Sequence, residues 1–487
     1  MFGRQRKPGA DPSDRVDEQD VGMSNSADVH GEKPTHHMHM PGYNHNGHKV
    51  TKGIKPEGES GRAWIHPQHF FRICFKSTST LSMIVNVLWP FVPPAIAIHF
   101  ARPEEHLWIF ILNYIAMVPT ANLIGFAGQE LARKLPKVFG VLLETFLGGV
   151  VEIVLFMVLI HNSVDNNLVP VIRAAILGSI LANLLLCLGF CFFAGGIRPG
   201  RTEQEFDEVI SEVGSGLLLM AGFGLLIPSA FYHSLDNTIY DPVDIEDRAL
   251  HISRITAVIL FIAFFIYVYF QTRSHHGIYD TVLGQDELRD HDRHKDLKKD
   301  KLTLTECIIA LAIAITCVSM HAVFLVQNIE YMVNERHIRD AFIGLILIPL
   351  VEKAAEHLTA VDEAWDNQMN FALAHILGAT TQTAMFNSSL VVIVGWGMGK
   401  GMDLNFEVFN IVVLILAIIV IGNFLRDQRS NYLEGAFAIL IYVLIGNRSP
   451  SIGEFFARLT YHAAAASFYY PDPPQGESNS NGGGGGE

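Results

Sequence analysis

The stretch Pro349-Leu-Val-Glu-Lys-Ala-Ala-Glu-His357 places two carboxylates, a lysine and a histidine inside an apolar region of the chain. A charged side chain at membrane depth costs on the order of 2.5–3.5 kcal/mol on insertion scales, so it persists there only when it is paired, hydrated or used. Upstream, Leu147-Gly-Gly-Val-Val-Glu-Ile-Val-Leu155 places Glu152 in a similar apolar setting. Two carboxylates in two similar hydrophobic settings indicate a membrane protein built from two related halves.

The distribution of apolar residues extends this pattern along the chain. Of the 487 residues, 49% are hydrophobic, and they form long apolar blocks separated by short polar breaks. Such blocks predict membrane-spanning helices, so we expect an all-α polytopic membrane protein with about 11 transmembrane helices. The blocks lie near residues 80–100, 107–126, 138 to beyond 152, 171–194, 214–231, 252–270, 304–326, 341–361, 369–397, 406–425 and 433–445.

A charged loop at residues 271–301 divides the blocks into one leading helix and two sets of five. Because five is odd, the two sets cross the membrane in opposite orientations, as inverted repeats do, with a site near the bilayer midplane. We interpret the loop as a solvated linker, with weak cation sensing or a regulatory role as the alternative. The predicted segments are a polar N-terminal tail (1–69), a first transmembrane helix (70–105), a first five-helix repeat (106–271), a charged linker (272–303), a second five-helix repeat (304–446) and a C-terminal tail (447–487).

Lysines and arginines in the short loops predict the orientation in the membrane. They place the even-numbered loops, the central loop and the N-terminus in the cytosol, although Arg336 and Arg339 oppose the trend. The polar N-terminal tail is predicted to be disordered. Its cluster His36-His37-Met38-His39-Met40 has two interpretations, a metal site or a solvated segment that titrates near neutral pH.

Several classes of function are disfavoured. The chain has no phosphate-binding loop, nucleophile elbow or dinucleotide fingerprint, so we expect neither an enzyme nor a cofactor, and an ATP-driven pump is disfavoured. The formal net charge of −14 and the lack of a basic face disfavour nucleic acid as a partner. The oligomeric state is not predicted by any pattern in the sequence.

Each half carries a second motif after its carboxylate. These motifs are Leu177-Gly-Ser-Ile-Leu-Ala-Asn183 and Leu377-Gly-Ala-Thr-Thr-Gln-Thr383, in which a glycine opens an apolar helix and a carboxamide follows at Asn183 or Gln382. Two carboxylates with hydroxyl and amide oxygens suit a hard cation, which prefers oxygen ligands. A carboxylate that binds either a cation or a proton also provides exchange chemistry, because protonation releases the ion.

The motif Leu177-Gly-Ser-Ile-Leu-Ala-Asn-Leu-Leu185 and the stretch Ala354-Ala-Glu-His357, taken together with three further blocks, resemble the cation/proton exchanger (CAX) family of vacuolar calcium transporters. The further blocks are Gly224-Leu-Leu-Ile-Pro-Ser-Ala-Phe231, Tyr267-Val-Tyr-Phe-Gln271 and Ser430-Asn-Tyr-Leu-Glu-Gly435, and the resemblance covers about residues 70–444. It implies eleven helices, with the first outside two five-helix repeats. It also implies a secondary antiporter of the vacuolar membrane that couples entry of calcium or a related cation to proton exit.

The resemblance also implies roles for individual residues. By position, Glu152 and Glu356 match the family's two essential carboxylates, which we expect to be the metal ligands. Residues that match the flanking positions of the same motifs are Ser179, Asn183, His357 and Gln382. For Asn183 and Gln382 an interhelical hydrogen bond remains an alternative to ion contact, and for His357 a packed neutral histidine remains an alternative to a proton acceptor.

The chain departs from the family at the positions that precede each glutamate. The family has a Gly-Asn pair there; the asparagine is replaced by Gly149 in the first half, and the pair is replaced by Glu352-Lys353 in the second. Lys353 precedes Glu356 by three residues, so both project from one helical face. Three interpretations follow: a monovalent cation is carried in place of calcium, Lys353 is a built-in cation in a non-transporting regulatory relative, or Lys353 snorkels away and calcium exchange survives.

Overall fold

Helices make up most of the described part of the chain. The computed structural model describes residues 49–62, 64–77, 79–164, 167–198, 203–235, 242–290, 293–336, 338 and 342–446. All of these residues belong to the second of two units into which the chain divides, 1–41 and 42–487. The predicted histidine cluster at 36–40 and the C-terminal tail therefore lie outside the described residues.

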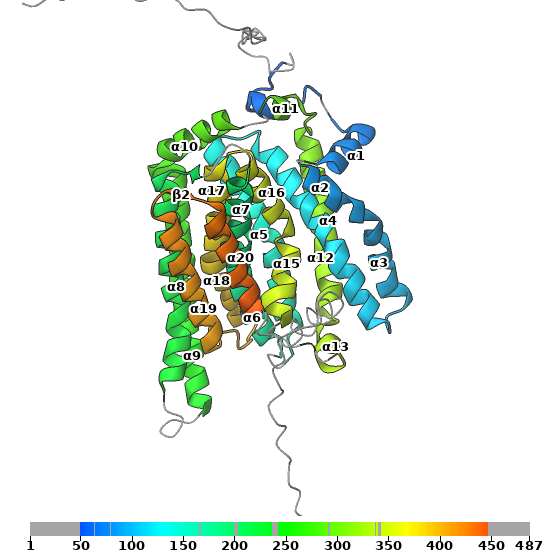
Figure 1. Cartoon of the computed structure of the whole chain (residues 1–487). Helices are drawn as coiled ribbons and strands as arrows, with labels where there is room; N and C mark the ends of the chain where they lie inside the picture. Colours follow the sequence, from blue (N-terminus) through cyan, green and yellow to red (C-terminus); the bar gives the residue numbers. More distant parts are fainter. Residues whose placement is uncertain are drawn as a thin grey trace, which may run out of the picture. The chain divides into compact units, whose positions relative to one another are not determined.

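The helices and strands follow one another in chain order as labelled in Figure 1. Two two-residue strands, β1 (Gln204–Glu205) and β2 (Arg429–Ser430), pair in an antiparallel manner. The helices are η1 (Pro56–Gly58), α1 (Pro67–Lys76), α2 (Thr80–Val85), η2 (Asn86–Phe91), α3 (Val92–Ala101), α4 (His106–Ala132), α5 (Lys137–Asn162), α6 (Val169–Leu181), η3 (Ala182–Cys187), α7 (Leu188–Gly196), α8 (Glu208–Ser234), α9 (Pro242–Tyr269), η4 (Phe270–Ser274), α10 (His276–Arg289), α11 (Arg293–Lys298), α12 (Leu304–Val326), α13 (Ile329–Asn334), η5 (Ile343–Leu347), α15 (Ile348–Glu352), α16 (Ala354–Trp365), α17 (Met369–Thr381), η6 (Gln382–Asn387), α18 (Ser388–Gly397), α19 (Val408–Leu425) and α20 (Tyr432–Gly446).

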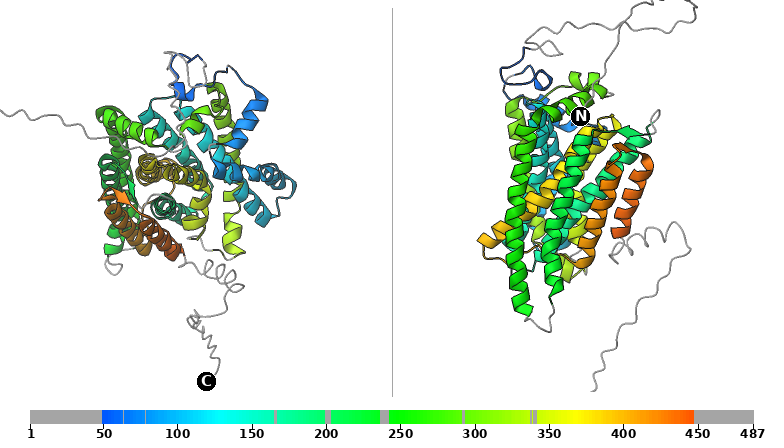
Figure 2. Two further views of the ribbon diagram at one scale, coloured as in Figure 1. Left: turned by 45° about the horizontal axis from the view of Figure 1, so that its top comes forward. Right: turned by 90° about the vertical axis from the view of Figure 1, so that its left-hand side faces the viewer.

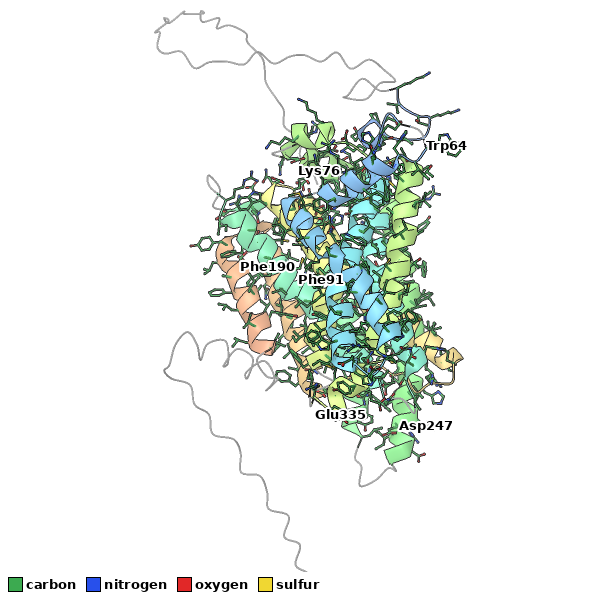
Figure 3. The ribbon with its side chains drawn as sticks, turned by 90° about the vertical axis from the view of Figure 1, so that its right-hand side faces the viewer. Trp64, Lys76, Phe91, Phe190, Asp247 and Glu335 are labelled. Carbon is green, nitrogen blue, oxygen red and sulfur yellow. The ribbon has the colours of Figure 1, made fainter. Side chains whose placement is uncertain are left out.

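The length and hydropathy of these helices fit a bilayer. Among the described residues, nine helices are long and apolar enough to span a membrane, and two shorter apolar helices cover Ile343–Glu352 and Tyr432–Gly446. Trp64 and Lys76 lie at one polar end, Asp247 and Glu335 lie at the other, and the exposed Phe91 lies between them (Figure 3). The polytopic helical fold is therefore confirmed. The two short helices occupy the eighth and eleventh predicted blocks, and a total of 11 spans stays a prediction.

Two central helices have the same internal construction. In the first half, α6, η3 and α7 form one helix with a π-helical turn at Ala182–Cys187, and in the second half α17, η6 and α18 repeat this with the turn at Gln382–Asn387. The apolar window of each helix is 83% buried, and both are seen nearly end-on in the interior of the bundle (Figure 2, left). Helix α17 contacts η3, and α6 contacts η6. Such π turns are frequent at functional sites, and here the two halves meet at theirs.

The N-terminal segment and the central loop pack at the same end of the bundle, the end at which α10 and α11 lie (top of Figure 1), which we call the loop end. The Lys134 ammonium donates hydrogen bonds to the Gly58 carbonyl (2.6 Å) and the Leu302 carbonyl (2.7 Å). Arg62 Nη2 donates to the Lys301 carbonyl at 2.7 Å. The loop is thus bound to the helices at both of its ends, since α10 also packs on α5 and α17.

Asp286, on α10, is a buried residue of the central loop. Its carboxylate accepts hydrogen bonds from the backbone N–H groups of Asn370 (2.9 Å) and Phe371 (3.2 Å). Those donors lie in the first turn of α17, where a helix has no backbone acceptors of its own and favours a negative charge. Burial raises the pKa of Asp286, and the hydrogen bonds from Phe371 and Asn370 oppose that shift. Asp286 therefore caps α17 from another helix.

Replacing Asp286 by alanine should destabilise the α10–α17 contact by about 1–3 kcal/mol, because two buried N–H groups lose their acceptor. Hydrogen exchange of the Asn370 and Phe371 amides should become faster than in the unmodified protein. Glu287→Ala on the same helix is the control, since it removes only a partly exposed ion pair with Lys137, which is worth about 0–1 kcal/mol. Unchanged exchange in Asp286→Ala would rule out the capping role.

Candidate functional site

Lys353 occupies a break between two helices. Helix α15 ends at Glu352 and α16 begins at Ala354, with Lys353 between them at φ −93° and ψ −4°. A proline at position 349 lacks an N–H group, and the π-helical η5 precedes α15. The eighth predicted block therefore contains η5, α15 and α16, with a one-residue irregularity at Lys353, whose N–H still donates to the Pro349 carbonyl at 3.0 Å.

The Lys353 ammonium lies between the two predicted carboxylates. Its Nζ atom is 3.0 Å from Glu152 Oε2 and 3.3 Å from Glu356 Oε2. The Lys353 side chain is 1% exposed and that of Glu152 is 0% exposed. The interpretation that Lys353 snorkels away is wrong: the carboxylates of both halves hold it in the interior.

Residues of the second half complete the surroundings of Glu152. Thr383 Oγ1 donates to Glu152 Oε2 at 2.7 Å, and Asn387 Nδ2 donates to the same oxygen at 3.0 Å. Both donors belong to the π-helical turn η6 and its end. Neither Thr383 nor Asn387 was predicted as a site residue from the sequence, in which the amide of Gln382 was the candidate in this motif. Thr383 could have been found, since it stands at the motif position that Asn183 occupies in the first half.

A reciprocal contact joins the second carboxylate region to the first half. His357, next to Glu356, lies with its Nε2 atom 3.1 Å from Asn183 Oδ1, in the turn η3. Asn183 and Thr383 thus each reach across to the opposite half from equivalent motif positions. The structure brings Asn183 and His357 together through this hydrogen bond, which was one of the two interpretations of Asn183.

Gln382 and Gly149 face each other. A Cβ atom at Gly149 would lie 2.3 Å from Gln382 Nε2, so the glycine makes room for the amide. Within the described part of the chain, that Nε2 atom has no hydrogen-bond partner. Gln382 therefore lies beside the α5 turn that carries Glu152, and an asparagine at position 149 would have to displace it.

Glu352 adds a third buried carboxylate. The residue is 2% exposed, and neither of its carboxylate oxygens has a hydrogen-bond partner among the described residues. Its interacting groups are Glu152, Lys353, Glu356 and Ser179. The site thus contains three carboxylates and one ammonium. Buried charges are expensive unless compensated, so this arrangement is typical of a site that takes up cations or protons.

The carboxylates of the site do not by themselves form a complete ligand set for a hard cation, so uncharged hydroxyl and amide oxygens would have to contribute. In the described ranges, no three His, Cys, Asp or Glu side chains converge as a metal-ligand group. The Ser179 hydroxyl, Glu152 Oε1 and Asn387 Oδ1 are buried oxygens without a hydrogen-bond partner in those ranges. Unsatisfied buried oxygens are rare in native structures. Asn387 lies at Glu152 and Ser179 interacts with Glu352, so these oxygens are available as ligands at the site.

A cavity leads from this site toward the loop end. It has a volume of about 30 Å³ and is lined by Glu356, His357, Asn183 and, farther out, Glu144 and His375. The Glu356 side chain is 21% exposed, whereas that of Glu152 is fully buried. The two carboxylates therefore differ in access: Glu356 borders the cavity, whereas Glu152 is fully buried.

Gly148 controls the position of the accessible carboxylate. A Cβ atom there would lie 2.3 Å from Glu356 Oε1, so Gly148→Ala should push the Glu356 carboxylate away from Lys353. We expect cation uptake to fall at least roughly tenfold, since a misplacement of a functional group by about 1 Å can lower a rate a hundredfold. The folded fraction should change little, because the Glu356 side chain can move. Gly216→Ala is the matched control, because a Cβ atom there meets nothing within 4 Å. Equal uptake by the two variants would contradict this geometry.

The family model described as "Sodium/calcium exchanger protein" matches two stretches of the chain, residues 105–273 and 307–445. Together these stretches cover more than half of the chain. The chain belongs to the sodium/calcium exchanger protein family. The two matched stretches carry Glu152 and Glu356 respectively.

Relatives of this exchanger-family chain confirm the resemblance drawn from its motifs. It is 34% identical to vacuolar cation/proton exchanger 5 of Arabidopsis thaliana over 365 residues, which is 75% of this chain and 80% of that protein. It is 31% identical to the vacuolar calcium ion transporter of Schizosaccharomyces pombe over 338 residues, which is 69% of this chain and 77% of that protein. The chain is therefore a transporter relative of the cation/proton exchangers, not an enzyme.

Solved structures share the fold. The structure of native YfkE matches with a TM-score of 0.59 at 24% identity, covering 74% of this chain and 98% of that one. The H+/Ca2+ exchanger CAX matches with a TM-score of 0.55 at 12% identity, covering 79% of this chain and 95% of that one. At these identities the likeness concerns the exchanger fold alone.

Proposed function

We propose that the chain is a secondary active antiporter that moves calcium or a related cation into an acidic organelle in exchange for protons. One observation carries this proposal: a carboxylate from each half, Glu152 and Glu356, lies within 3.3 Å of a single buried cation, the Lys353 ammonium. Two carboxylates, one from each half, that bind one buried positive charge form a site. At this site a transported cation or a proton can compete with the ammonium for the same oxygens. The relatives named as vacuolar cation/proton exchangers support the same activity.

The exchange follows from competition at the two carboxylates. A cation that enters through the cavity meets Glu356 first, since that side chain is the accessible one. It replaces the ammonium of Lys353, which swings from the carboxylates on its flexible stem. Protons that reach the carboxylates from the acidic side neutralise them, and the cation is released because its oxygen ligands lose their charge.

Individual residues have proposed roles in this cycle. Glu152 and Glu356 bind the cation or the proton, and Ser179, Asn183, Gln382 and His357 supply or orient the neighbouring polar groups. Gly149, Glu352 and Lys353 modify the site. Glu352 offsets the charge of Lys353, so that the site keeps the net charge of two carboxylates when all four groups are ionised. That balance supports calcium or another divalent cation as the cargo.

Two alternatives follow from the same lysine. A tethered ammonium reduces the attraction for a second charge, so sodium or potassium is the alternative cargo. A lysine that never leaves the carboxylates would make the protein a non-transporting regulatory relative. The double change Lys353→Asn with Glu352→Gly tests this last alternative, because it should then create calcium uptake in a silent parent. Gly149→Asn is left out of the test because Gln382 occupies the space its side chain needs.

We further propose the vacuolar membrane as the location, in line with the relatives, and the loop end as the cytosolic end. Residues 49–62 pack with the central loop at that end, which supports the predicted placement of the N-terminal segment and the loop on one side. The cavity at Glu356 then faces the cytosol, the side from which a cation bound for the organelle enters.

An ion panel in reconstituted vesicles tests the proposed function. Vesicles with an acidic interior should take up calcium, and uptake should stop when the proton gradient is collapsed. The panel contains calcium, manganese, sodium and potassium, with empty vesicles as the control. Uptake of sodium or potassium without calcium would favour the monovalent alternative. Uptake of none of the four would contradict the antiporter and favour the regulatory relative.

A further inference from the structure

A second group of titratable side chains lies apart from Lys353 and its carboxylates. His375 on α17 is hydrogen-bonded through Nδ1 to Glu363 Oε2 on α16 at 2.9 Å. Its other ring nitrogen, Nε2, lies 3.3 Å from Glu144 Oε2 on α5. The three side chains are each less than one fifth exposed. We call this group the His375 cluster.

The geometry of the cluster fits a protonated imidazole. Ionised carboxylates only accept hydrogen bonds, so a ring with carboxylate oxygens at both nitrogens is best matched when both nitrogens carry protons. Histidine is the side chain that changes charge near neutral pH without special perturbation. The cluster can therefore hold one extra proton, which the two flanking carboxylates stabilise on the ring.

The cluster lies between the central site and the loop end. Glu144 and His375 line the same cavity as Glu356 and His357. On the other side, Glu144, His375 and Glu363 line a cavity at the loop end that α10 and α11 border. In the described part of the chain no ion pair joins His375 to Glu356, and the electrostatic influence of His375 reaches Glu356 through space. Glu144 and His375 therefore border both cavities.

We propose that the His375 cluster is the proton-transfer station between Glu356 and the loop end. The inference rests on the proposed function. The imidazolium gives up one ring proton at the loop-end cavity, and the neutral ring then accepts the proton that leaves the Glu356 carboxyl through the intervening cavity. One O–H bond breaks at Glu356 and one N–H bond forms at His375, so each turn passes one proton and restores the imidazolium. The intervening cavity, about 30 Å³ in volume, is large enough to hold a water molecule between the two groups.

The surrounding charges support this direction of transfer. Glu144 faces the ring from α5 and Glu363 from α16, and both stabilise the imidazolium after it forms. Asp286 of α10 acts on Glu363 electrostatically. Acidic and basic side chains both border the loop-end cavity, among them Glu287 and Lys137, which form an ion pair. The alternative is a structural clamp, in which His375 only links α5, α16 and α17 through its contacts with Glu144 and Glu363.

The test is the pH profile of calcium uptake in vesicles, with the pH difference across the membrane held constant while both sides are shifted from about pH 6 to about pH 8. The unmodified protein should show uptake that rises with pH across this range. His375→Gln should lower uptake by roughly tenfold or more at the upper end, since a positioned proton-transfer group contributes at least that much, and should flatten the profile. His321→Gln is the matched control, because His321 is a buried histidine on α12 bonded to Asn113, and it should keep the profile.

A clamp would behave differently. If His375→Gln lowered uptake by the same factor at every pH, with the midpoint retained, the transfer role would be overturned. Should that variant fail to fold, Glu144→Gln is the second test, because it retains the His375–Glu363 bond. This change should move the midpoint of the pH profile to lower pH, because it removes one of the two charges that favour the imidazolium. An unmoved midpoint would overturn the proposal as well. Absence of proton-driven uptake in the unmodified protein would instead refute the proposed function.

Discussion

Replacing Lys353 by methionine should destabilise the protein by about 3–5 kcal/mol, because the change leaves buried carboxylates without the charge that compensates them. Glu152 and Glu356 both lose their ion pair with the ammonium, and Glu352 has no hydrogen-bond partner in the described residues. Thermal unfolding in detergent measures the effect. Adding Glu352→Gln to Lys353→Met should recover part of the loss, since one of the three carboxylates is then neutral.

Calcium provides a sharper readout of the same change. If the ammonium occupies the cation site, added calcium should raise the melting temperature of Lys353→Met more than that of the unmodified protein, because the vacated carboxylates bind it in the folded state only. Lys134→Met is the matched control: Lys134 is also buried, but its ammonium binds two backbone carbonyls at the loop end. A calcium effect of equal size in both variants would show that Lys353 does not occupy the site.

Glu152→Gln should reduce proton-driven calcium uptake to the level of empty vesicles. Glutamine keeps the size of the side chain and can still accept the hydrogen bond from Thr383, but it carries neither the negative charge nor the exchangeable proton. Initial uptake rates, normalised to folded protein, measure the loss.

A glutamate of equal burial provides the control for that experiment. Glu306 is 0% exposed, as is Glu152, but it caps the start of α12 by accepting from the Thr303 N–H. Glu306→Gln should leave uptake within about a factor of two, because an amide oxygen can still accept in a capping box. Uptake by Glu152→Gln at the level of Glu306→Gln would remove Glu152 from the transport site.

The sequence alone predicted the helices and the pairing of the two glutamates. Apolar blocks that are long enough to span a bilayer predict the helical fold independently of how the helices pack. The central helices α6 and α17 lie where their blocks predicted. The break at Lys353 was not predicted, although Pro349 stands four residues before it. Whether a proline ends a helix depends on the neighbours that satisfy its freed backbone groups, and those neighbours come from distant parts of the chain.

The contacts of the site were predicted only in part. That Lys353 and Glu356 share a face follows from their spacing, and the ion pair is present. The stronger partner of Lys353 is Glu152, about two hundred residues earlier, which no local pattern can pair with it. The His375 cluster was missed for the same reason, since its three members come from α5, α16 and α17 and form no motif in the sequence.

The measurement that tests the central claim most directly is simultaneous recording of calcium entry and proton exit in the same vesicles. The account predicts that the two fluxes start together, keep a fixed ratio as the calcium concentration is varied, and disappear together in Glu152→Gln. It would be contradicted by calcium entry that continues after the proton gradient is removed, or by proton exit that does not depend on the cation.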